Sequence, residues 1–104
     1  MSEPIRNEEQ ESGVGLAEEI REPKRFKVLL HNDNYTTMEF VVKVLMQVFR
    51  KTEAEAVQIM LNVHNKGVGV CGVYTAEVAE LKVSLVRRLA RQNGFPLKCS
   101  MEEV

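Results

Sequence analysis

The sequence predicts an α+β domain in which a three-stranded antiparallel sheet packs against three helices, in the order β-α-α-β-α-β. Three observations predict this class: three short strand-like apolar runs, three longer segments with apolar residues every three or four positions, and capping or glycine signals between them. A chain of 104 residues is long enough for one modest core and too short for two. Helices packed on one side of such a sheet give a layered fold.

The N-terminal region differs in composition from the rest of the chain. Residues 1–22 contain seven Glu and two Arg, a net charge of −5, whereas the remainder has twelve basic and eight acidic residues, a net charge of +4. This region has no apolar run that could offset the entropy cost of ordering it. We therefore expect a flexible, disordered acidic tail over residues 1–23 and a core domain over residues 24–104. A short amphipathic turn within the tail is the alternative.

The first strand and the first helix follow this tail. FKVLL, residues 26–30, predicts the strand, and TTMEF opens the helix. Thr36 followed three residues later by Glu39 fits a capping box, in which two side chains bond to backbone amides at a helix start. The helix should end near Lys51. Its apolar face is formed by Met38, Val41, Val42, Leu45 and Phe49.

A second capping box, Thr52 with Glu55, predicts the start of the next helix, and Gly67 supplies a left-handed stop. The apolar stripe of this helix consists of Ala56, Ile59, Met60 and Val63.

The remaining segments predict a strand, a helix and a strand. Residues 68–75 are β-branched and contain glycines, which indicates a strand. Thr75 can cap a helix over residues 76–93, with Glu77 in its first turn and arginines toward its end, the order that the helix dipole favours. Residues 97–104 form the last strand.

Composition also argues against several functional classes. The net charge of −1 gives no reason to expect a nucleic acid or a membrane as partner. No segment approaches the ~20 apolar residues of a membrane span, and the first residues are acidic where a signal peptide is basic. We expect a cytoplasmic protein. Cys71 and Cys99 are interpreted as small buried hydrophobic residues rather than a disulfide or redox pair.

The segment HNDNYTTMEF, residues 31–40, places an imidazole, amides and a carboxylate directly after an apolar run. Acceptors without a nucleophile suit a cationic donor such as an ammonium group. Taken alone, Asn32 and Asp33 could instead form a turn between strand and helix. His64 could be a near-core histidine or cap a helix end, and methionines 38 and 60 could simply fill the core.

Four separated motifs resemble the bacterial ClpS adaptor family. They are VLLHNDNYTTMEFVVKVL, AVQIMLNVHNKG, VCGVYTAEVAELKV and FPLKCSMEE, in order and at matching spacing over residues 24–104. The resemblance implies a non-enzymatic adaptor without cofactor or metal. Such an adaptor binds the first residue of N-degron proteins and delivers them to a Clp AAA+ unfoldase of the ClpA or ClpC type for degradation. The family also implies a monomer that docks on the N-terminal domain of the unfoldase.

The resemblance assigns roles to individual residues. Asn32, Asp33 and His64 match the family positions that hold the α-ammonium group, which needs acceptors, at least one of them charged, when it leaves water. The family prefers Leu, Phe, Tyr or Trp as first residue, and Met38 matches its gate against β-branched side chains. Thr36 matches the family position at the edge of the pocket. The positions that line the pocket are matched by Val41, Met60, Val63 and Leu97.

The resemblance also covers a partner surface and shows two departures. Glu77 and Lys82 match positions that dock on the unfoldase, although a dipole-stabilising glutamate and a solvated lysine are the ordinary alternatives. By analogy, the N-terminal tail is engaged by the unfoldase. Asn34 stands where the family commonly has an acid, which lowers the local negative charge. Thr37 stands where it often has proline, which loosens the helix start slightly.

Two other functional classes compete with this hypothesis. A hydrolase could combine His64 with Asp33 and a cysteine, but neither cysteine stands at a helix start and no oxyanion-hole motif occurs. A docking module like the C-terminal domain of the ribosomal stalk protein would have no amino-acid pocket. A metal site from the histidines and cysteines lacks paired ligand spacing. We also expect Asp33→Ala to abolish binding and leave the fold intact, as for an exposed turn carboxylate.

Overall fold

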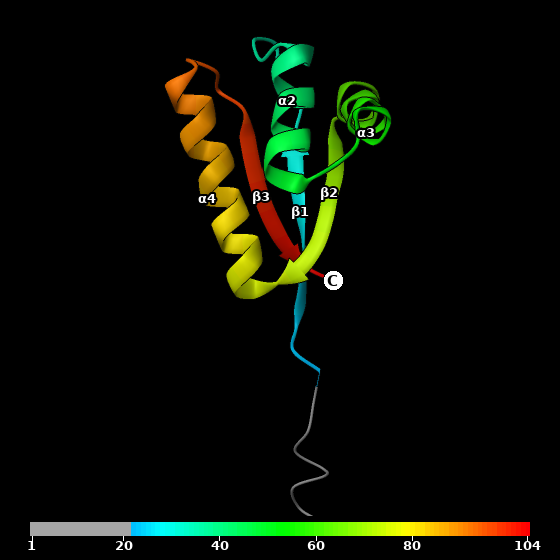
Figure 1. Ribbon diagram of the computed structural model, residues 1–104, viewed down its shortest axis with the longest axis vertical. Coiled ribbons are helices and arrows are strands. Elements are labelled where there is room, and N and C mark those ends of the chain that lie inside the picture. Colours follow the sequence, from blue (N-terminus) through cyan, green and yellow to red (C-terminus); the bar gives the residue numbers. More distant parts are fainter. Residues whose placement is uncertain (1–21) are drawn as a thin grey trace, which may run out of the picture.

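The computed structural model describes residues 22–104 and shows six elements along the chain (Figure 1). They are β1 (Arg25–His31), α2 (Met38–Phe49), α3 (Glu53–Lys66), β2 (Val68–Thr75), α4 (Ala76–Gln92) and β3 (Lys98–Glu103). The sheet has the order β2-β1-β3, and both pairings are antiparallel. The predicted α+β fold and its element order are confirmed. The expected tail lies outside the described residues except for its last two positions, so the boundary at residue 23 stays a prediction.

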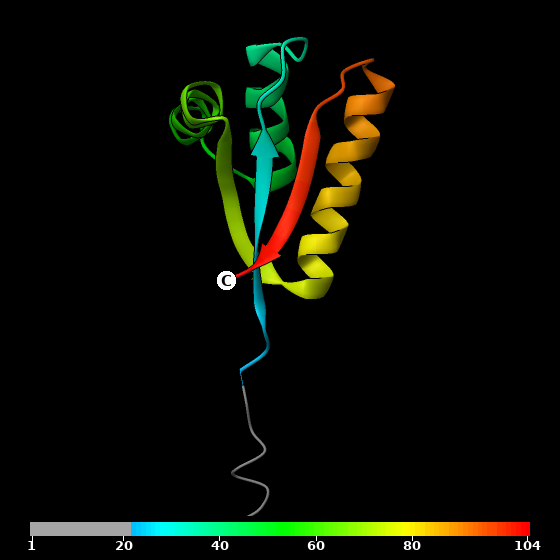
Figure 2. The ribbon, with the colours of Figure 1, turned by 180° about the vertical axis from the view of Figure 1, so that it is seen from behind.

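The three helices cover one face of the sheet, and the view from behind shows the strands in front of them (Figure 2). Burial alternates accordingly along β2, where Gly69 and Cys71 are buried while Val68 and Val70 are exposed. In a strand, successive side chains point to opposite faces, so one face of β2 packs on the helices and the other remains open.

The core lies between the sheet and the helices. Its most deeply buried side chains come from every layer of the fold and are Val28, Leu30, Val44, Leu45, Cys71, Val86 and Cys99. Both cysteines are free and buried. Their interpretation as small buried hydrophobic residues is confirmed.

The capping signals were predicted correctly for α3 and one residue too early for α2. At α3, the Thr52 hydroxyl and the Glu55 carboxylate exchange bonds with each other's backbone amides, at 3.2 and 2.9 Å. At α2 the cap is Thr37, whose Oγ1 accepts from the Phe40 amide at 3.1 Å. The box predicted at Thr36 is wrong because the hydroxyl and the amide of that residue are both bonded to the preceding aspartate.

Gly69 allows α3 to lie directly against β2. A Cβ atom at this position would stand 2.7 Å from Cγ2 of Val63 and 3.2 Å from the carbonyl oxygen of Ile59. A contact of 2.7 Å is shorter than packed carbon atoms tolerate, and one of the two neighbours is backbone. The absence of a side chain at Gly69 therefore sets how closely the last turns of α3 approach the sheet.

We predict that Gly69→Ala lowers the free energy of unfolding by about 1–3 kcal/mol, the usual cost of overpacking. Urea unfolding followed by circular dichroism measures the change. The control is Asn65→Ala on the exposed side of α3, which should alter stability by less than about 0.5 kcal/mol. Equal stability of both variants would contradict this account of the packing.

Candidate functional site

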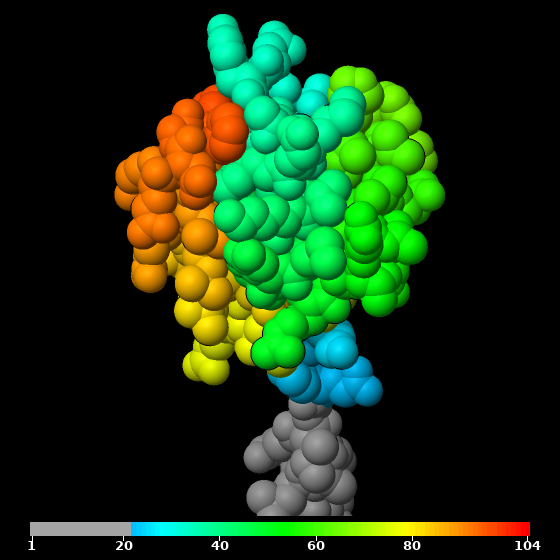
Figure 3. Space-filling model, turned by 45° about the horizontal axis from the view of Figure 1, so that its top comes forward, coloured from blue at the N-terminus to red at the C-terminus, as the bar shows by residue number. Residues whose placement is uncertain are grey.

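A cavity of about 260 Å³ opens where the loop after β1 meets the last turns of α3. Figure 3, in which the top of the molecule comes forward, shows these two regions of the chain side by side. The lining residues combine amides, a carboxylate, a hydroxyl and an imidazole with apolar side chains. They are Asn32, Asp33, Asn34, Thr36, Met38, Val41, Met60, Val63 and His64.

The structure thus gathers eight of the nine residues that sequence reasoning placed at one site, and Leu97 is the exception. Leu97 is buried in the core, just before β3. It shares the core cluster of Val41 and Val63, and the next residue, Lys98, pairs with His31 at the end of β1. Leu97 is not among the residues that line the cavity, and its part in the pocket stays a prediction. Asn34, which sequence reasoning treated only as a departure, does line it, and its position beside Asn32 and Asp33 was the available signal.

Asp33 organises the loop from which the polar part of the cavity is built. Its Oδ1 accepts hydrogen bonds from the amides of Tyr35 and Thr36 at 2.8 and 2.7 Å, and its Oδ2 accepts from the Thr36 hydroxyl at 2.7 Å. Burial raises the pKa of this carboxyl, but the bonds from Thr36 and Tyr35 outweigh it and hold the pKa below its ordinary value. Asp33 is therefore a fixed negative charge at neutral pH.

The turn interpretation and the binding interpretation of Asp33 are compatible. An ionised carboxylate has about four acceptor positions, and the loop uses three, so one remains for a further donor. The view of Asp33 as an exposed carboxylate with little effect on the fold is wrong. The side chain is half-buried and its hydrogen bonds hold the loop, so we expect Asp33→Ala to disturb the loop structure as well as binding.

The loop is joined to α3 by one backbone hydrogen bond. The Asn32 amide donates to the carbonyl oxygen of Gly67 at 2.9 Å. Gly67 ends α3 with φ 88°, a left-handed conformation that glycine adopts without strain. This bond brings the loop beside His64, which stands in the last turn of α3.

The side chains of Asn32 and His64 are exposed, and no hydrogen bond joins either of them to another described residue. His64 is therefore neither a core histidine nor a side-chain cap of α3. With Asp33, these two side chains supply acceptors to the cavity lining.

The rest of the cavity lining is mainly apolar. Val41 and Val63 are buried and form its floor, and Met60 is half-buried. Met38 begins α2 and is 46% exposed, so it stands at the mouth rather than filling the core. The cavity consequently combines negative, acceptor-rich groups with an apolar floor.

His31 belongs to the sheet and not to the cavity. Its Nε2 lies 2.7 Å from Oγ of Ser100 on β3. Burial, and then the positive charge of Lys98, lower the pKa of the imidazole, while Glu102 opposes them. Only part of the polar segment that follows the apolar run therefore contributes to the site.

Neither cysteine lines the cavity, and neither has the character of an activated nucleophile. Burial raises the pKa of the Cys71 thiol far above its usual range and raises that of Cys99 to about 12. Among residues 22–104, no three His, Cys, Asp or Glu side chains gather as a metal site would require. None of the helices described could cross a membrane.

Two larger grooves exist, but their chemistry differs. The one between α4 and β3 measures about 570 Å³ and is lined by three arginines, which would repel a cation. The one between α2 and α4 measures about 510 Å³ and contains Arg50, Lys82 and Arg88. The smaller cavity joins a carboxylate to a buried apolar floor and has no lysine or arginine among its lining residues.

The family model described as "ATP-dependent Clp protease adaptor protein ClpS" matches residues 21–100. The chain belongs to the ClpS family. A ClpS adapter of Oleidesulfovibrio alaskensis is 60% identical over the full length of both chains. That of Nitratidesulfovibrio vulgaris strain Miyazaki F is 65% identical over 86% of this chain and 89% of its own. The solved structure of Agrobacterium tumefaciens ClpS2 bound to L-phenylalaninamide superposes with a TM-score of 0.78, at 38% identity, over 80% of this chain and all of that one.

We predict that the Asp33 turn makes stability depend on pH. Because the folded-state pKa lies below the ordinary value of 3.8, the carboxylate's contribution is fully present above that value and is lost as the pH falls through the folded-state pKa. At neutral pH, the free energy of unfolding of the wild type should exceed that of Asp33→Asn by about 1 kcal/mol. Urea unfolding near neutrality and near pH ~2.5 should show this difference shrinking on acidification. A difference that stays constant would contradict the assignment.

Proposed function

We propose that the chain is a non-catalytic adaptor of a Clp protease that binds proteins through a free, bulky amino-terminal residue and delivers them to a Clp AAA+ unfoldase for degradation. The observation that carries the proposal is one small cavity that joins the fixed charge of Asp33 to an apolar floor. The superposed Agrobacterium protein, bound to L-phenylalaninamide, supports it, because that compound combines an α-amino group with an aromatic side chain.

The acceptors of Asn32, Asp33 and His64 suit an α-ammonium group. Such a group carries a positive charge and three donors, and it leaves water only where acceptors replace the lost hydration. The free position on the Asp33 carboxylate, the carbonyl of Asn32 and a ring nitrogen of His64 supply three acceptors in the cavity lining. The charged acceptor is the strongest of the three.

The apolar floor suits one side chain. About 260 Å³ is less than the ~300–1,000 Å³ typical of sites for drug-sized ligands. Burying a side chain such as Leu or Phe contributes about 2 kcal/mol. Met38, half-exposed at the mouth, acts as the gate that disfavours a branched Cβ, so Leu, Phe, Tyr and Trp are admitted and Ile and Val are not.

The absence of a catalytic role rests on the same residues. The acceptors around the cavity bind protons or cations, and the two thiols lie elsewhere with raised pKa values. A water-activating or acyl-transfer mechanism needs a nucleophile and a base within hydrogen-bond reach. The one hydroxyl–carboxylate pair in the cavity lining, Thr36 with Asp33, is held within the turn before α2, and the adaptor acts by binding.

The exposed face of α4 is the proposed docking surface for the N-terminal domain of the unfoldase. Glu77 and Lys82 flank Val78 and Leu81, which are 41% and 59% exposed. An apolar centre with charged edges is the usual anatomy of a protein interface. The adaptor would meet its partner as a monomer in the cytoplasm.

Lys82 also has an internal role. Its Nζ donates to the Val48 carbonyl oxygen at 2.8 Å and lies 5.7 and 5.2 Å from the ring centroids of Phe49 and Tyr74. Removing this side chain would therefore disturb the end of α2 as well as the surface. Glu77, exposed in the first turn of α4, is the cleaner residue for testing docking.

We predict selective binding of labelled peptides that differ only in their first residue: Leu, Phe, Ile and acetylated Phe. The Leu and Phe peptides should bind, and Ile should bind at least about tenfold more weakly because of the Met38 gate. Acetylation removes the charge and two donors and should abolish binding. Fluorescence anisotropy measures all four. Equal or absent binding across the set would favour the alternative, a docking module without an amino-acid pocket.

We also predict opposite effects of two single-charge changes. Asp33→Asn retains a side chain that can bond within the turn but removes the charge, so affinity for the Phe peptide should fall at least tenfold, about 1.4 kcal/mol. Asn34→Asp adds a carboxylate at the cavity and should raise affinity about two- to fivefold at low salt. Asn34→Gln is the neutral control. If both charge changes shifted affinity in the same direction, electrostatic recognition of the ammonium group would be refuted.

A further inference from the structure

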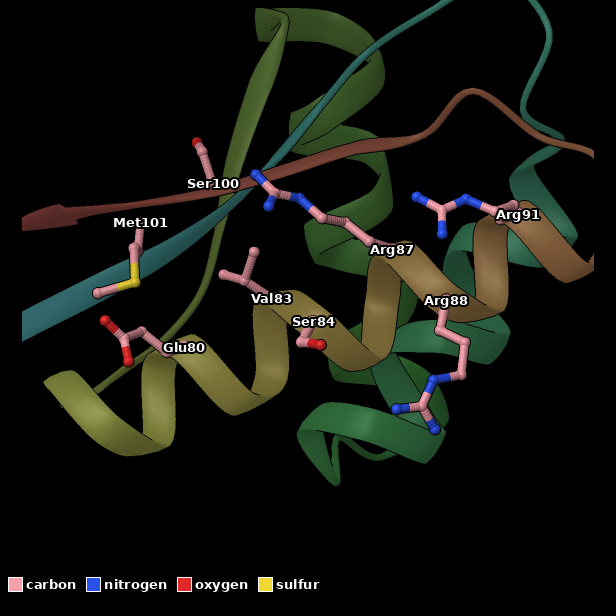
Figure 4. Close-up of a pocket in the computed structure, with 8 residues that line it drawn as sticks. All are labelled: Glu80, Val83, Ser84, Arg87, Arg88, Arg91, Ser100 and Met101. Atoms are coloured by element: carbon pink, nitrogen blue, oxygen red, sulfur yellow. The ribbon is translucent and has the colours of Figure 1, made fainter.

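The groove between α4 and β3 is a cationic surface that the proposed adaptor function does not use. Figure 4 shows Arg87 and Arg91 extending toward the β3 side of α4, while Arg88 points away from it. Glu80 lies near the other end, beside Met101 (Figure 4). Two serine hydroxyls complete the polar lining, contributed by Ser84 and Ser100.

The arginines of this groove are available to carboxylates from outside the core domain. Arg87 is positioned by a hydrogen bond from Nη2 to the Cys99 carbonyl oxygen at 3.2 Å. Within residues 22–104, no carboxylate lies within salt-bridge distance of Arg87, Arg88 or Arg91. Guanidinium groups bind carboxylates in a two-point geometry, so the groove suits an acidic polypeptide segment.

We propose that this groove binds the acidic N-terminal segment of the same chain, with Glu8, Glu9 and Glu11 supplying the carboxylates. Charge complementarity carries the choice of occupant, because residues 1–22 have a net charge of −5 and the remainder has +4. Connectivity adds to it, since a tethered segment faces the groove at an effective concentration in the millimolar range.

The segment enters beside α4. Arg25 at the start of β1 is paired with Thr75, the residue directly before α4. From Ala76 to Arg91 the helix rises about 22 Å. The ten residues between Glu11 and Glu22 make eleven Cα–Cα steps, which can span up to about 36 Å. The glutamates therefore reach the arginines without any change in the core.

The contact is a surface electrostatic one, reversible and weakened by salt. It would hold the N-terminal segment against α4 until a partner with stronger contacts displaces it. This is a property of the segment and the groove, and it does not depend on ligand in the cavity at the β1–α2 loop.

Paramagnetic relaxation enhancement in the full-length chain tests the proposal. A spin label at Ser12→Cys reacts selectively, because the native Cys71 and Cys99 are only 1% and 0% exposed. At low salt we expect broadening of the amide signals of Ser84, Arg87 and Ser100. The broadening should disappear at about 0.5 M salt, where charges are screened within a few ångström.

Charge-removing variants separate this contact from random encounters. Arg87→Gln with Arg91→Gln should abolish the broadening, and Arg91→Gln alone should reduce it without removing the bond to the Cys99 carbonyl. The matched control, Lys43→Gln with Lys66→Gln, removes the same charge from exposed positions outside the groove and should leave the broadening intact.

Three results would overturn the proposal. They are an absence of broadening at the groove, broadening that survives the arginine changes, and broadening that appears only between labelled and isotope-enriched copies in a mixed sample. The last would assign the groove to a second copy of the chain.

Discussion

The cavity depends on the hydrogen bonds that the Asp33 carboxylate accepts from Tyr35 and Thr36. They close a turn directly after β1 and leave Thr37 to cap α2, so the start of that helix and the orientation of the loop are set together. The bond from the Asn32 amide to the Gly67 carbonyl then attaches the loop to the end of α3. A charge that is fixed by the fold needs little reorganisation when it meets a cation, which is why one side chain can serve the structure and the site together.

Close packing beneath the loop is the second requirement. Gly69 lets the last turns of α3 approach the sheet. Val63, on these turns, packs close to Gly69 and forms part of the cavity floor. The acceptors come from a loop and a helix end, whereas the apolar floor comes from helix interiors. The polar groups of the site thus come from exposed positions in a loop and at a helix end, and the apolar groups come from helix positions that pack in the core.

Sequence reasoning recovered the fold because its signals were local and agreed with one another. The Thr52–Glu55 box, the Gly67 stop and the apolar spacing each specify an element without knowledge of the others. The α2 cap was misplaced because the competition between Thr36 and Thr37 is decided by Asp33, three residues earlier, through a side-chain bond that spacing does not reveal. Leu97 was grouped with the cavity through the family resemblance, and its place in the core cluster of Val41 and Val63 leaves that role a prediction. The bonding of Lys82 to Val48 joins positions 34 residues apart and had no sequence signal.

The two free cysteines can report on local opening of the folded protein. Cys71 and Cys99 lie on strands that flank β1 on opposite sides, and both point into the layer beneath the helices. A reagent in solution can reach them only when that layer parts, so their rates of modification follow the frequency of cooperative opening rather than thiol chemistry. A difference between the two rates would show which edge of the sheet separates first.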